Sequence, residues 1–193
     1  MNKKFIVRMM VGALMMGSSA VSMAAANNVG GSQATISGSV VSPTCTVTSW
    51  PTDIQFNPVN VAEYATLSHN SVIQEVSQGQ FELANCPANT AMKFTVTATQ
   101  QAVGNRFQAL VQEASGREVS GLALSFAAAS GSANYWYLDG SERGLGITND
   151  QGSLSIPAYA FLLKRGNNPA PNVNGVAYTG NFSTTLQYTV SYD

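Results

Sequence analysis

The 193-residue sequence has little of the chemistry on which most enzymes rely. It contains one histidine, His69, and only 10% of its residues are charged. A lone histidine in the polar stretch LSHN argues against a Ser-His-Asp or Cys-His centre, which needs a histidine base beside its nucleophile. The sequence has no P-loop, nucleophile elbow or HExxH motif. We therefore expect no enzyme, and hydrolysis by a pair of the scattered carboxylates is the enzymatic alternative that stays open.

Long apolar runs are also lacking. The longest early run, from Met9 to Met16, is far shorter than the roughly 20 residues of a membrane-spanning helix. Three basic residues within the first eight positions precede this run, and small residues follow it at 24–26. This three-part pattern predicts a secretory signal peptide over residues 1–26, which is cleaved on export. We expect the mature chain to be soluble.

Charge and cysteine are scarce in the chain that would remain. Residues 27–193 hold six basic and ten acidic residues, a net charge of −4, which gives no basic footprint for nucleic acid. Cys45 and Cys86 are the two cysteines. An even count in an exported protein predicts one disulfide, because the compartment beyond the inner membrane is oxidising. Two unpaired buried thiols are the alternative, and no set of zinc ligands is present, so we expect no metal or cofactor.

What the sequence has in abundance is strand-forming segments. Stretches rich in Val, Thr, Phe, Tyr and Leu alternate with turn signals of Gly, Asn, Ser and Pro. The expected strands are residues 34–41, 71–76, 80–83, 91–99, 119–127, 134–138, 154–163 and a closing strand. No stretch has a helical period with caps, although residues 61–69 allow a helical turn or two. The pattern predicts one all-β domain, a sandwich or a barrel.

The closing segment, YTGNFSTTLQYTVSYD, alternates most strictly. One parity carries Phe182, Thr184, Leu186, Tyr188, Val190 and Tyr192, and the other parity is polar. This period predicts a strand with one buried and one solvent-facing side, roughly 40 Å long at about 3.4 Å per residue. No later segment can pair with it, so any edge left open would expose unpaired backbone groups.

An extended arm precedes the first expected strand. The stretch NNVGGS runs without a break into ATISGSVV, and the residues of one parity are Asn28, Gly30, Ser32, Ala34 and Ile36. A frayed terminus is the default interpretation of such a composition. The plain description is a flexible, extended arm.

Three motifs carry a resemblance to a known family. In ISGSVVSPTC, Ile36 precedes a GxV pattern and the first cysteine, and in FELANC, Leu83 stands three residues before the second cysteine. Gly180 is the fourteenth residue from the carboxyl end, and Tyr192 is the penultimate residue. Together these motifs resemble the chaperone–usher pilins, the subunits of bacterial fimbriae such as type 1 and P pili.

The resemblance implies an incomplete immunoglobulin-like sandwich that lacks its seventh strand. Donor-strand complementation by another chain would complete it. The implied domains are a donor-strand extension over residues 27–36 and a pilin domain over residues 37–193. The implied donor residues are Asn28, Gly30, Ser32, Ala34 and Ile36. The implied groove and chaperone-binding residues are Gly180, Phe182, Thr184, Leu186, Tyr188, Val190, Tyr192 and Asp193.

The resemblance also implies a function and a set of partners. The chain would be a structural subunit of a surface fimbria that supports adhesion, delivered by a periplasmic chaperone to an outer-membrane usher. It would polymerise with neighbouring pilin subunits as a shaft or adaptor subunit, and contact a host receptor only indirectly, if at all. The alternative is a minor subunit with carbohydrate-binding adhesin activity, with Trp50, Tyr135, Trp136 and Tyr137 as candidate sugar-binding residues.

Overall fold

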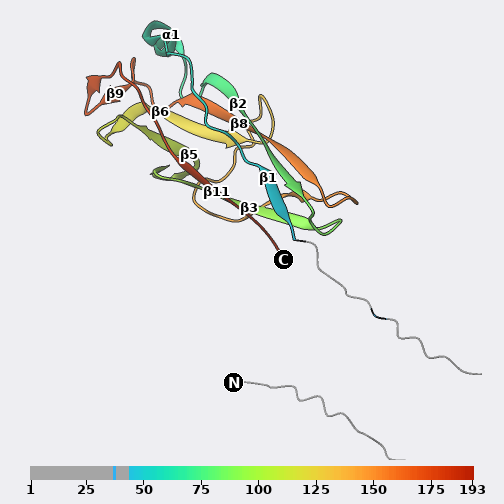
Figure 1. Ribbon diagram of the computed structural model, residues 1–193. Coiled ribbons are helices and arrows are strands. Elements are labelled where there is room, and N and C mark those ends of the chain that lie inside the picture. The colour runs from blue at the N-terminus through green and yellow to red at the C-terminus, as the bar shows by residue number, and fades with distance from the viewer. Residues whose placement is uncertain (1–36, 38–43) are drawn as a thin grey trace, which may run out of the picture. The chain divides into compact units, whose positions relative to one another are not determined.

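The structure, a computed structural model, describes Ser37 and residues 44–193, which contain two β-sheets (Figure 1). The larger sheet has the strand order β1-β2-β8-β6-β5-β4, with β9 paired to β6 and β10 to β9, and the smaller has the order β11-β3-β7. The elements are β1 Thr46–Ser49, α1 Val61–Thr66, β2 Val72–Ala84, β3 Ala91–Ala98, β4 Gln101–Ala102, β5 Asn105–Gln112, β6 Glu118–Ala127, β7 Arg143–Ile147, β8 Leu154–Lys164, β9 Asn172–Val173, β10 Val176–Ala177 and β11 Leu186–Tyr192. The predicted all-β sandwich is confirmed.

The core lies between the two sheets. Phe81 of β2, Phe126 of β6 and Leu162 of β8 come from the larger sheet, and Val96 of β3 comes from the smaller one. Each of these side chains is at most 2% exposed. Burial of such an apolar side chain stabilises the fold by about 1.5–3 kcal/mol, so packing between the sheets holds the sandwich together.

Three of the expected strands match the structure closely, and two others merge. Residues 91–99, 119–127 and 154–163 correspond to β3, β6 and β8. Apart from residue 71, the expected strands at 71–76 and 80–83 belong to the single strand β2, because register shifts within it absorb the break in the pattern without ending its pairing with β8. The expected strand at 34–41 lies outside the described residues.

The strand expected at residues 134–138 is wrong. The backbone N–H of Trp136 donates to the Phe126 carbonyl, and that of Leu138 donates to the Arg106 carbonyl, both at 2.7 Å. The Leu138 carbonyl in turn accepts from Ala98 of β3 at 3.0 Å. This segment is extended, but its hydrogen bonds go to both sheets, so it links them and joins neither.

The short helix α1 corresponds to the helical turn or two expected within residues 61–69. The Asn60 side chain caps it by accepting from the N–H of Ala62 at 2.9 Å. Tyr64 is fully buried and donates its hydroxyl to the Gly121 carbonyl at 2.8 Å, and Lys164 donates to the Tyr64 carbonyl at 3.0 Å. These contacts fix the helix to β6 and β8.

The predicted disulfide between Cys45 and Cys86 is confirmed. It joins the residue before β1 to the residue that follows β2 by two positions. The N–H of Cys86 donates to the Gly152 carbonyl at 3.0 Å. Gly152 has a φ of +70°, and a Cβ there would collide with the Cys86 carbonyl, so this turn requires glycine.

Candidate functional site

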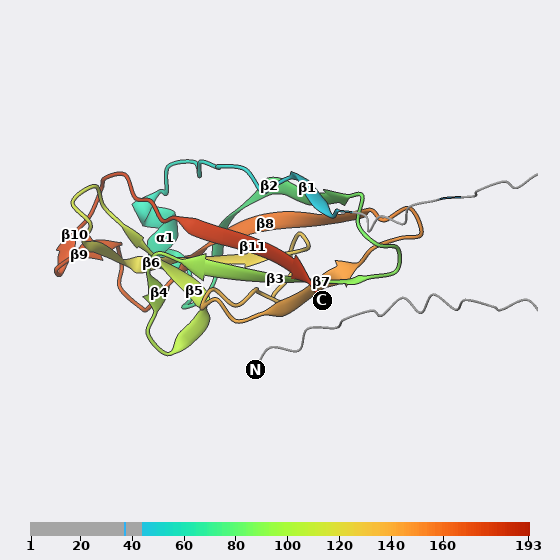
Figure 2. The same ribbon diagram turned by 60° about the horizontal axis from the view of Figure 1, so that its bottom comes forward.

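The candidate site is the edge of β11, the last strand. Within residues 44–193, β3 is the one strand that pairs with β11, from Leu186 opposite Ala98 to Tyr192 opposite Met92, and Figure 2 shows β3 alongside it. The N–H of Thr99 donates to the Thr185 carbonyl at 2.9 Å. Because backbone groups alternate in direction along a strand, odd-numbered residues of β11 face β3 and even-numbered ones face away.

The outward-directed residues are Leu186, Tyr188, Val190 and Tyr192, which we call the open edge. None of the described residues makes a backbone hydrogen bond to them on this side. Four N–H and four C=O groups therefore lie along a strand of seven residues, roughly 20 Å long. Such an edge is a template for pairing with a further strand.

The side chains of the open edge are less covered than their neighbours on the same sheet face. Met92 and Val96 on β3 are each 1% exposed. Tyr188, directly opposite Val96, is only half-buried, and Tyr192, opposite Met92, is 40% exposed. Opposed residues share a sheet face, so the greater exposure of Tyr188 and Tyr192 shows that other side chains cover this face less over β11 than over β3. We call this less covered region the gap in the cover over β11.

Across this gap lie β1 and the chain that follows it. Val47, Ile54, Phe56 and Val59 are half-buried and pack against the same core as the open edge. Trp50 is 41% exposed and contacts Phe81 edge-to-face, with ring centroids 5.9 Å apart. We call Trp50 and the open edge together the open apolar face.

A polar contact crosses the floor of this face. The Tyr188 hydroxyl donates to the side-chain oxygen of Gln78 at 3.1 Å, and Gln78 is 7% exposed. The Gln78 carbonyl accepts from the N–H of Thr52 at 2.8 Å. Burial raises the pKa of Tyr188 well above its ordinary value. The contact ties β11 through β2 to the segment after β1.

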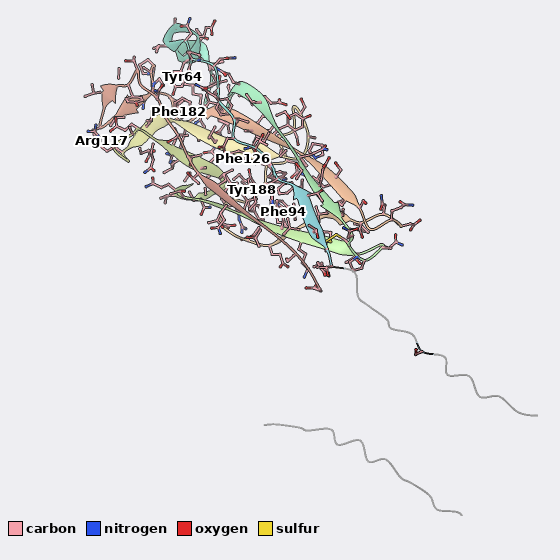
Figure 3. All side chains as sticks on the ribbon, in the orientation of Figure 1. Tyr64, Phe94, Arg117, Phe126, Phe182 and Tyr188 are labelled. Carbon is pink, nitrogen blue, oxygen red and sulfur yellow. A yellow bond between two sulfur atoms is a disulfide. The ribbon has the colours of Figure 1, made fainter. Side chains whose placement is uncertain are left out.

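The closing segment alternates in exposure as predicted, but its regular strand is shorter. Phe182 and Thr184 are half-buried, and Figure 3 shows Phe182 and Tyr188 at two separate points along the closing segment. β11 begins only at Leu186, because Ser183 exchanges two backbone hydrogen bonds with Gln112 of β5, each 2.8 Å long. The segment thus passes from the edge of β5 to the edge of β3.

Gly180 and Asp193 mark the two ends of the segment. A Cβ at Gly180 would collide with the Tyr178 ring, whose hydroxyl donates to the Asn181 carbonyl at 2.5 Å. The Asp193 carboxylate accepts from the Lys93 amine at 2.5 Å, and Glu142 lies 3.3 Å from the same amine. The hydrogen bond to Asp193 is the main cause of the raised pKa of Lys93. Asp193 is thereby held beside β3.

The expected donor residues all lie outside the part of the chain that the structure describes. These residues are Asn28, Gly30, Ser32, Ala34 and Ile36. The same holds for the signal peptide at residues 1–26. Sequence reasoning missed Trp50 and Gln78 as parts of the site. Trp50 followed β1, which was not expected as a strand, and Gln78 lay in the gap between the two expected strands that merge in β2.

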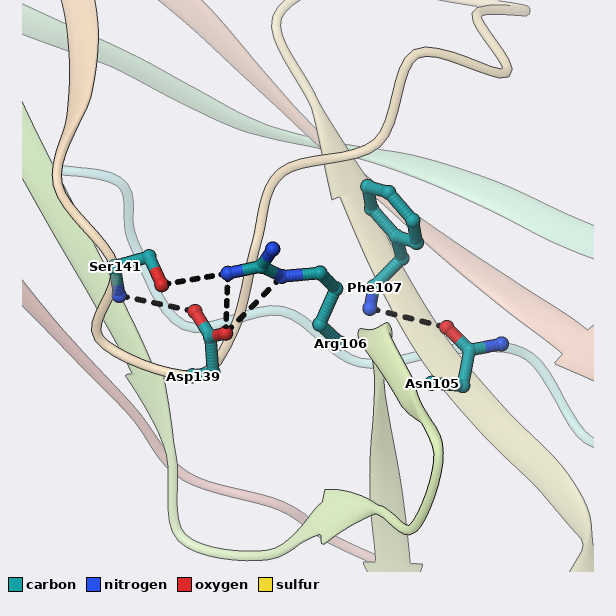
Figure 4. Close-up of polar contacts among 5 residues, drawn as sticks. All are labelled: Asn105, Arg106, Phe107, Asp139 and Ser141. Carbon is teal, nitrogen blue, oxygen red and sulfur yellow. Dashed lines mark hydrogen bonds and ion pairs between the residues drawn. The ribbon is translucent and has the colours of Figure 1, made fainter.

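Two of the four aromatic residues considered for sugar binding, Trp136 and Tyr137, are already engaged within this protein. Trp136 is 7% exposed and packs in the core, 5.2 Å from the Phe94 ring. The Tyr137 ring instead contacts two guanidinium groups, with its centroid 3.8 Å from Cζ of Arg106 and 4.1 Å from Cζ of Arg143. Arg106 is in turn paired with Asp139 at 2.8 Å (Figure 4). A Tyr ring that contacts two cations in this way is already engaged in cation–π interactions.

Other features of the described residues offer little chemistry. Two cavities flank β7, with volumes of about 470 and 260 Å³, and neither is lined by a residue of β11. Within residues 44–193, no group of three or more His, Cys, Asp or Glu is placed to hold a metal ion. No helix in this part of the chain is long and apolar enough to cross a membrane. His69 is exposed and accepts from the N–H of Gly166 at 2.7 Å.

Comparison with solved structures identifies the fold. No protein-family model and no curated protein sequence matches the chain. One match is a chain from a chaperone–usher pilus, in a structure that reveals the molecular basis of rod uncoiling. It matches with a TM-score of 0.51 and 19% identity, over 88% of this chain and 100% of that one. The P pilus rod subunit PapA matches with a TM-score of 0.48 and 17% identity over 77% and 99% of the two chains.

The first likeness shows that this protein has the immunoglobulin-like fold of a chaperone–usher pilus chain. The resemblance drawn from the three sequence motifs is therefore confirmed at the level of the fold.

Proposed function

We propose that this protein is a structural subunit of a bacterial surface fimbria that polymerises by donor-strand exchange. The arm of one copy, residues 27–36, pairs with the open edge of the next copy and completes its sandwich. One observation carries the proposal: Leu186, Tyr188, Val190 and Tyr192 present both unpaired backbone groups and incompletely covered apolar side chains along one edge. An added strand is the partner that satisfies both at once.

The energetics favour an added strand. Each new backbone hydrogen bond contributes roughly 0.5–1.5 kcal/mol net, and eight backbone groups are available along the open edge. Covering the half-buried side chains adds about 25 cal/mol per Å² of apolar surface removed from water. A contact in which each copy gives an arm to the next and receives one from the copy before is head-to-tail, and such contacts build a filament when their rotation does not close into a ring.

The same edge motivates the proposed partners and route. An exposed edge of this kind promotes aggregation unless it is covered, so a periplasmic chaperone holds β11 before an outer-membrane usher passes the subunit to its neighbour. The proposed chaperone-binding residues run from Gly180 to Asp193. The signal peptide over residues 1–26 directs export, the pilin domain spans 37–193, and the polymer lies at the cell surface. We propose no sugar site, because Trp136 is buried and the Tyr137 ring is engaged by two guanidinium groups.

Proline at position 190 tests the proposal. The N–H of Val190 points away from β3, so Val190→Pro removes a donor from the open edge and leaves the β11–β3 ladder intact. Val190→Ala is the matched control, since it shortens the side chain and keeps the N–H. We expect the mature Val190→Ala protein to polymerise in electron micrographs, and the Val190→Pro protein to stay monomeric with an unchanged circular dichroism spectrum. Polymers of equal length from both variants would contradict donor-strand exchange at this edge.

A further inference from the structure

The smaller of the two cavities that flank β7 carries hydrogen-bond donors and one cation in its wall. Its polar lining residues are Ser132, Asn134, Tyr135 and Arg143. The Ser132 oxygen accepts from the N–H of Asn134 at 3.0 Å, which leaves the Ser132 hydroxyl free to donate. Among the described residues, no aspartate or glutamate lines this cavity. Donors and a cation without a carboxylate favour a negatively charged ligand.

The cation, Arg143 of β7, has no acidic partner of its own. It is half-buried, and no hydrogen bond or ion pair within residues 44–193 uses its guanidinium group. The other basic side chains in this range that reach the surface each make an ion pair, and they are Lys93, Arg106, Arg117 and Arg165. The charge of Arg143 is therefore left for a partner from outside the domain.

The Arg143 guanidinium group is also held in place. Its Cζ lies 4.1 Å from the centroid of the Tyr137 ring. That ring is fixed in turn by Phe107, with ring centroids 4.9 Å apart. An arginine binds a carboxylate through two parallel N–H bonds, and one that is already restrained loses less side-chain freedom on binding.

The remainder of the cavity is apolar and firmly packed. Phe94 and Trp136 belong to its wall, are 4% and 7% exposed, and meet edge-to-face at 5.2 Å. Tyr135 is fixed by the Phe161 ring at 5.4 Å. The cavity volume of about 260 Å³ is smaller than the roughly 300–1,000 Å³ of drug-sized sites. It suits a flat ligand the size of a single ring.

We propose that this cavity binds a small organic carboxylate with a flat apolar body, such as an aromatic monocarboxylate. Arg143 binds the carboxylate group, the Ser132 hydroxyl adds a donor, and the body packs against Phe94 and Trp136. The uncompensated charge sets this ligand class, and a neutral sugar does not supply the matching group. No residue of β11 lines the cavity, so the inference goes beyond the proposed function and does not depend on it.

Benzoate is the probe, and titration calorimetry of the mature protein measures its affinity. We expect one site per chain with a Kd of about 1 mM or lower. Benzyl alcohol has the ring without the charge, and acetate has the charge without the ring, so each should bind at least about tenfold more weakly. In Trp50→Phe, Trp136 is the one tryptophan of the mature chain, and benzoate should change its fluorescence with the same Kd.

Arg143→Gln should weaken benzoate binding at least about tenfold, because it removes the charge-assisted hydrogen bonds. Arg143→Lys keeps the charge and should retain more of the affinity than Arg143→Gln. Arg117→Gln is the matched control and should bind like the wild-type protein, since Arg117 is paired with Glu113 and lines neither cavity.

Three results would overturn the inference. One is no benzoate binding at about 10 mM, well above the expected Kd. Another is equal affinity for benzoate and benzyl alcohol, which would exclude recognition of the carboxylate. The third is wild-type affinity in Arg143→Gln, or equal losses in Arg143→Gln and Arg143→Lys, either of which would exclude the charge of Arg143 as the binding group.

Discussion

Phe81 supports both sides of the open apolar face, and its removal is the most demanding test of the packing. The side chain is fully buried and meets four aromatic rings, those of Trp50, Phe94, Trp136 and Tyr188, at centroid distances of 5.4 to 6.2 Å. Truncation of a buried phenylalanine to alanine costs about 3–5 kcal/mol. Since edge-to-face pairs add about 0.5–1.5 kcal/mol beyond buried area, we expect Phe81→Ala to cost about 5 kcal/mol.

The assay is urea unfolding of the mature chain without residues 27–36, so that polymerisation does not interfere. Whole domains are stable by about 5–15 kcal/mol, so Phe81→Ala should remove about a third of that stability or more and shift the urea midpoint strongly downward. Phe81→Leu keeps much of the volume and should cost about 1.5 kcal/mol, a measurable shift of the urea midpoint.

Phe107→Ala is the matched control. Phe107 is 36% exposed and contacts one ring, that of Tyr137, so its truncation should cost about 1 kcal/mol or less. If Phe81→Ala cost no more stability than Phe107→Ala, the packing of Trp50 and Tyr188 against the buried Phe81 ring would be refuted.

Two further predictions concern pH and backbone. Burial raises the pKa of Tyr188, so the buried neutral Tyr188 stabilises the fold fully below about pH 10, the ordinary tyrosine pKa, and this stabilisation is lost as the pH rises further. Urea unfolding between pH 9 and 12 should therefore show a smaller loss of stability with rising pH in Tyr188→Phe than in the wild-type protein. Equal losses in the two proteins would contradict the burial of Tyr188. Gly152→Ala should destabilise by about 2 kcal/mol or more through positive φ and collision with Cys86. Gly175→Ala, with a φ of +81° and open space, should lose only about 1 kcal/mol, and equal losses in thermal melts would exclude the collision.

The fold was predictable where alternation and pairing agree. The two-residue repeat of apolar side chains predicted β3, β6 and β8, and it identified which residues of the closing segment are half-buried. It failed at Tyr135-Trp136-Tyr137, where the alternation is real but the backbone bonds to two sheets. It also missed β7, whose Arg-Gly-Leu-Gly-Ile sequence is typical of a glycine turn and becomes a strand only through pairing with β3.

One half of the candidate site, the open edge, was predictable from the sequence. The sequence identified the residues of the open edge, because they share one parity of the last strand. The other half depends on where distant segments meet: Trp50 and Tyr188 are far apart in the chain, and only the position of Phe81 between them brings both rings to one face. No local pattern around Trp50 or Gln78 carries that information.

The central claim is that the domain requires a strand from another copy, and a single-chain variant tests it most directly. Residues 27–41 are appended after Asp193 through a short flexible linker, and a control carries the same residues in scrambled order. We predict a monomer that no longer polymerises. Its melting temperature should exceed that of the control by about 10 °C or more, since each kcal/mol gained shifts the midpoint by about 2–4 °C at this size. Unchanged melting temperature and unchanged polymerisation would contradict the account.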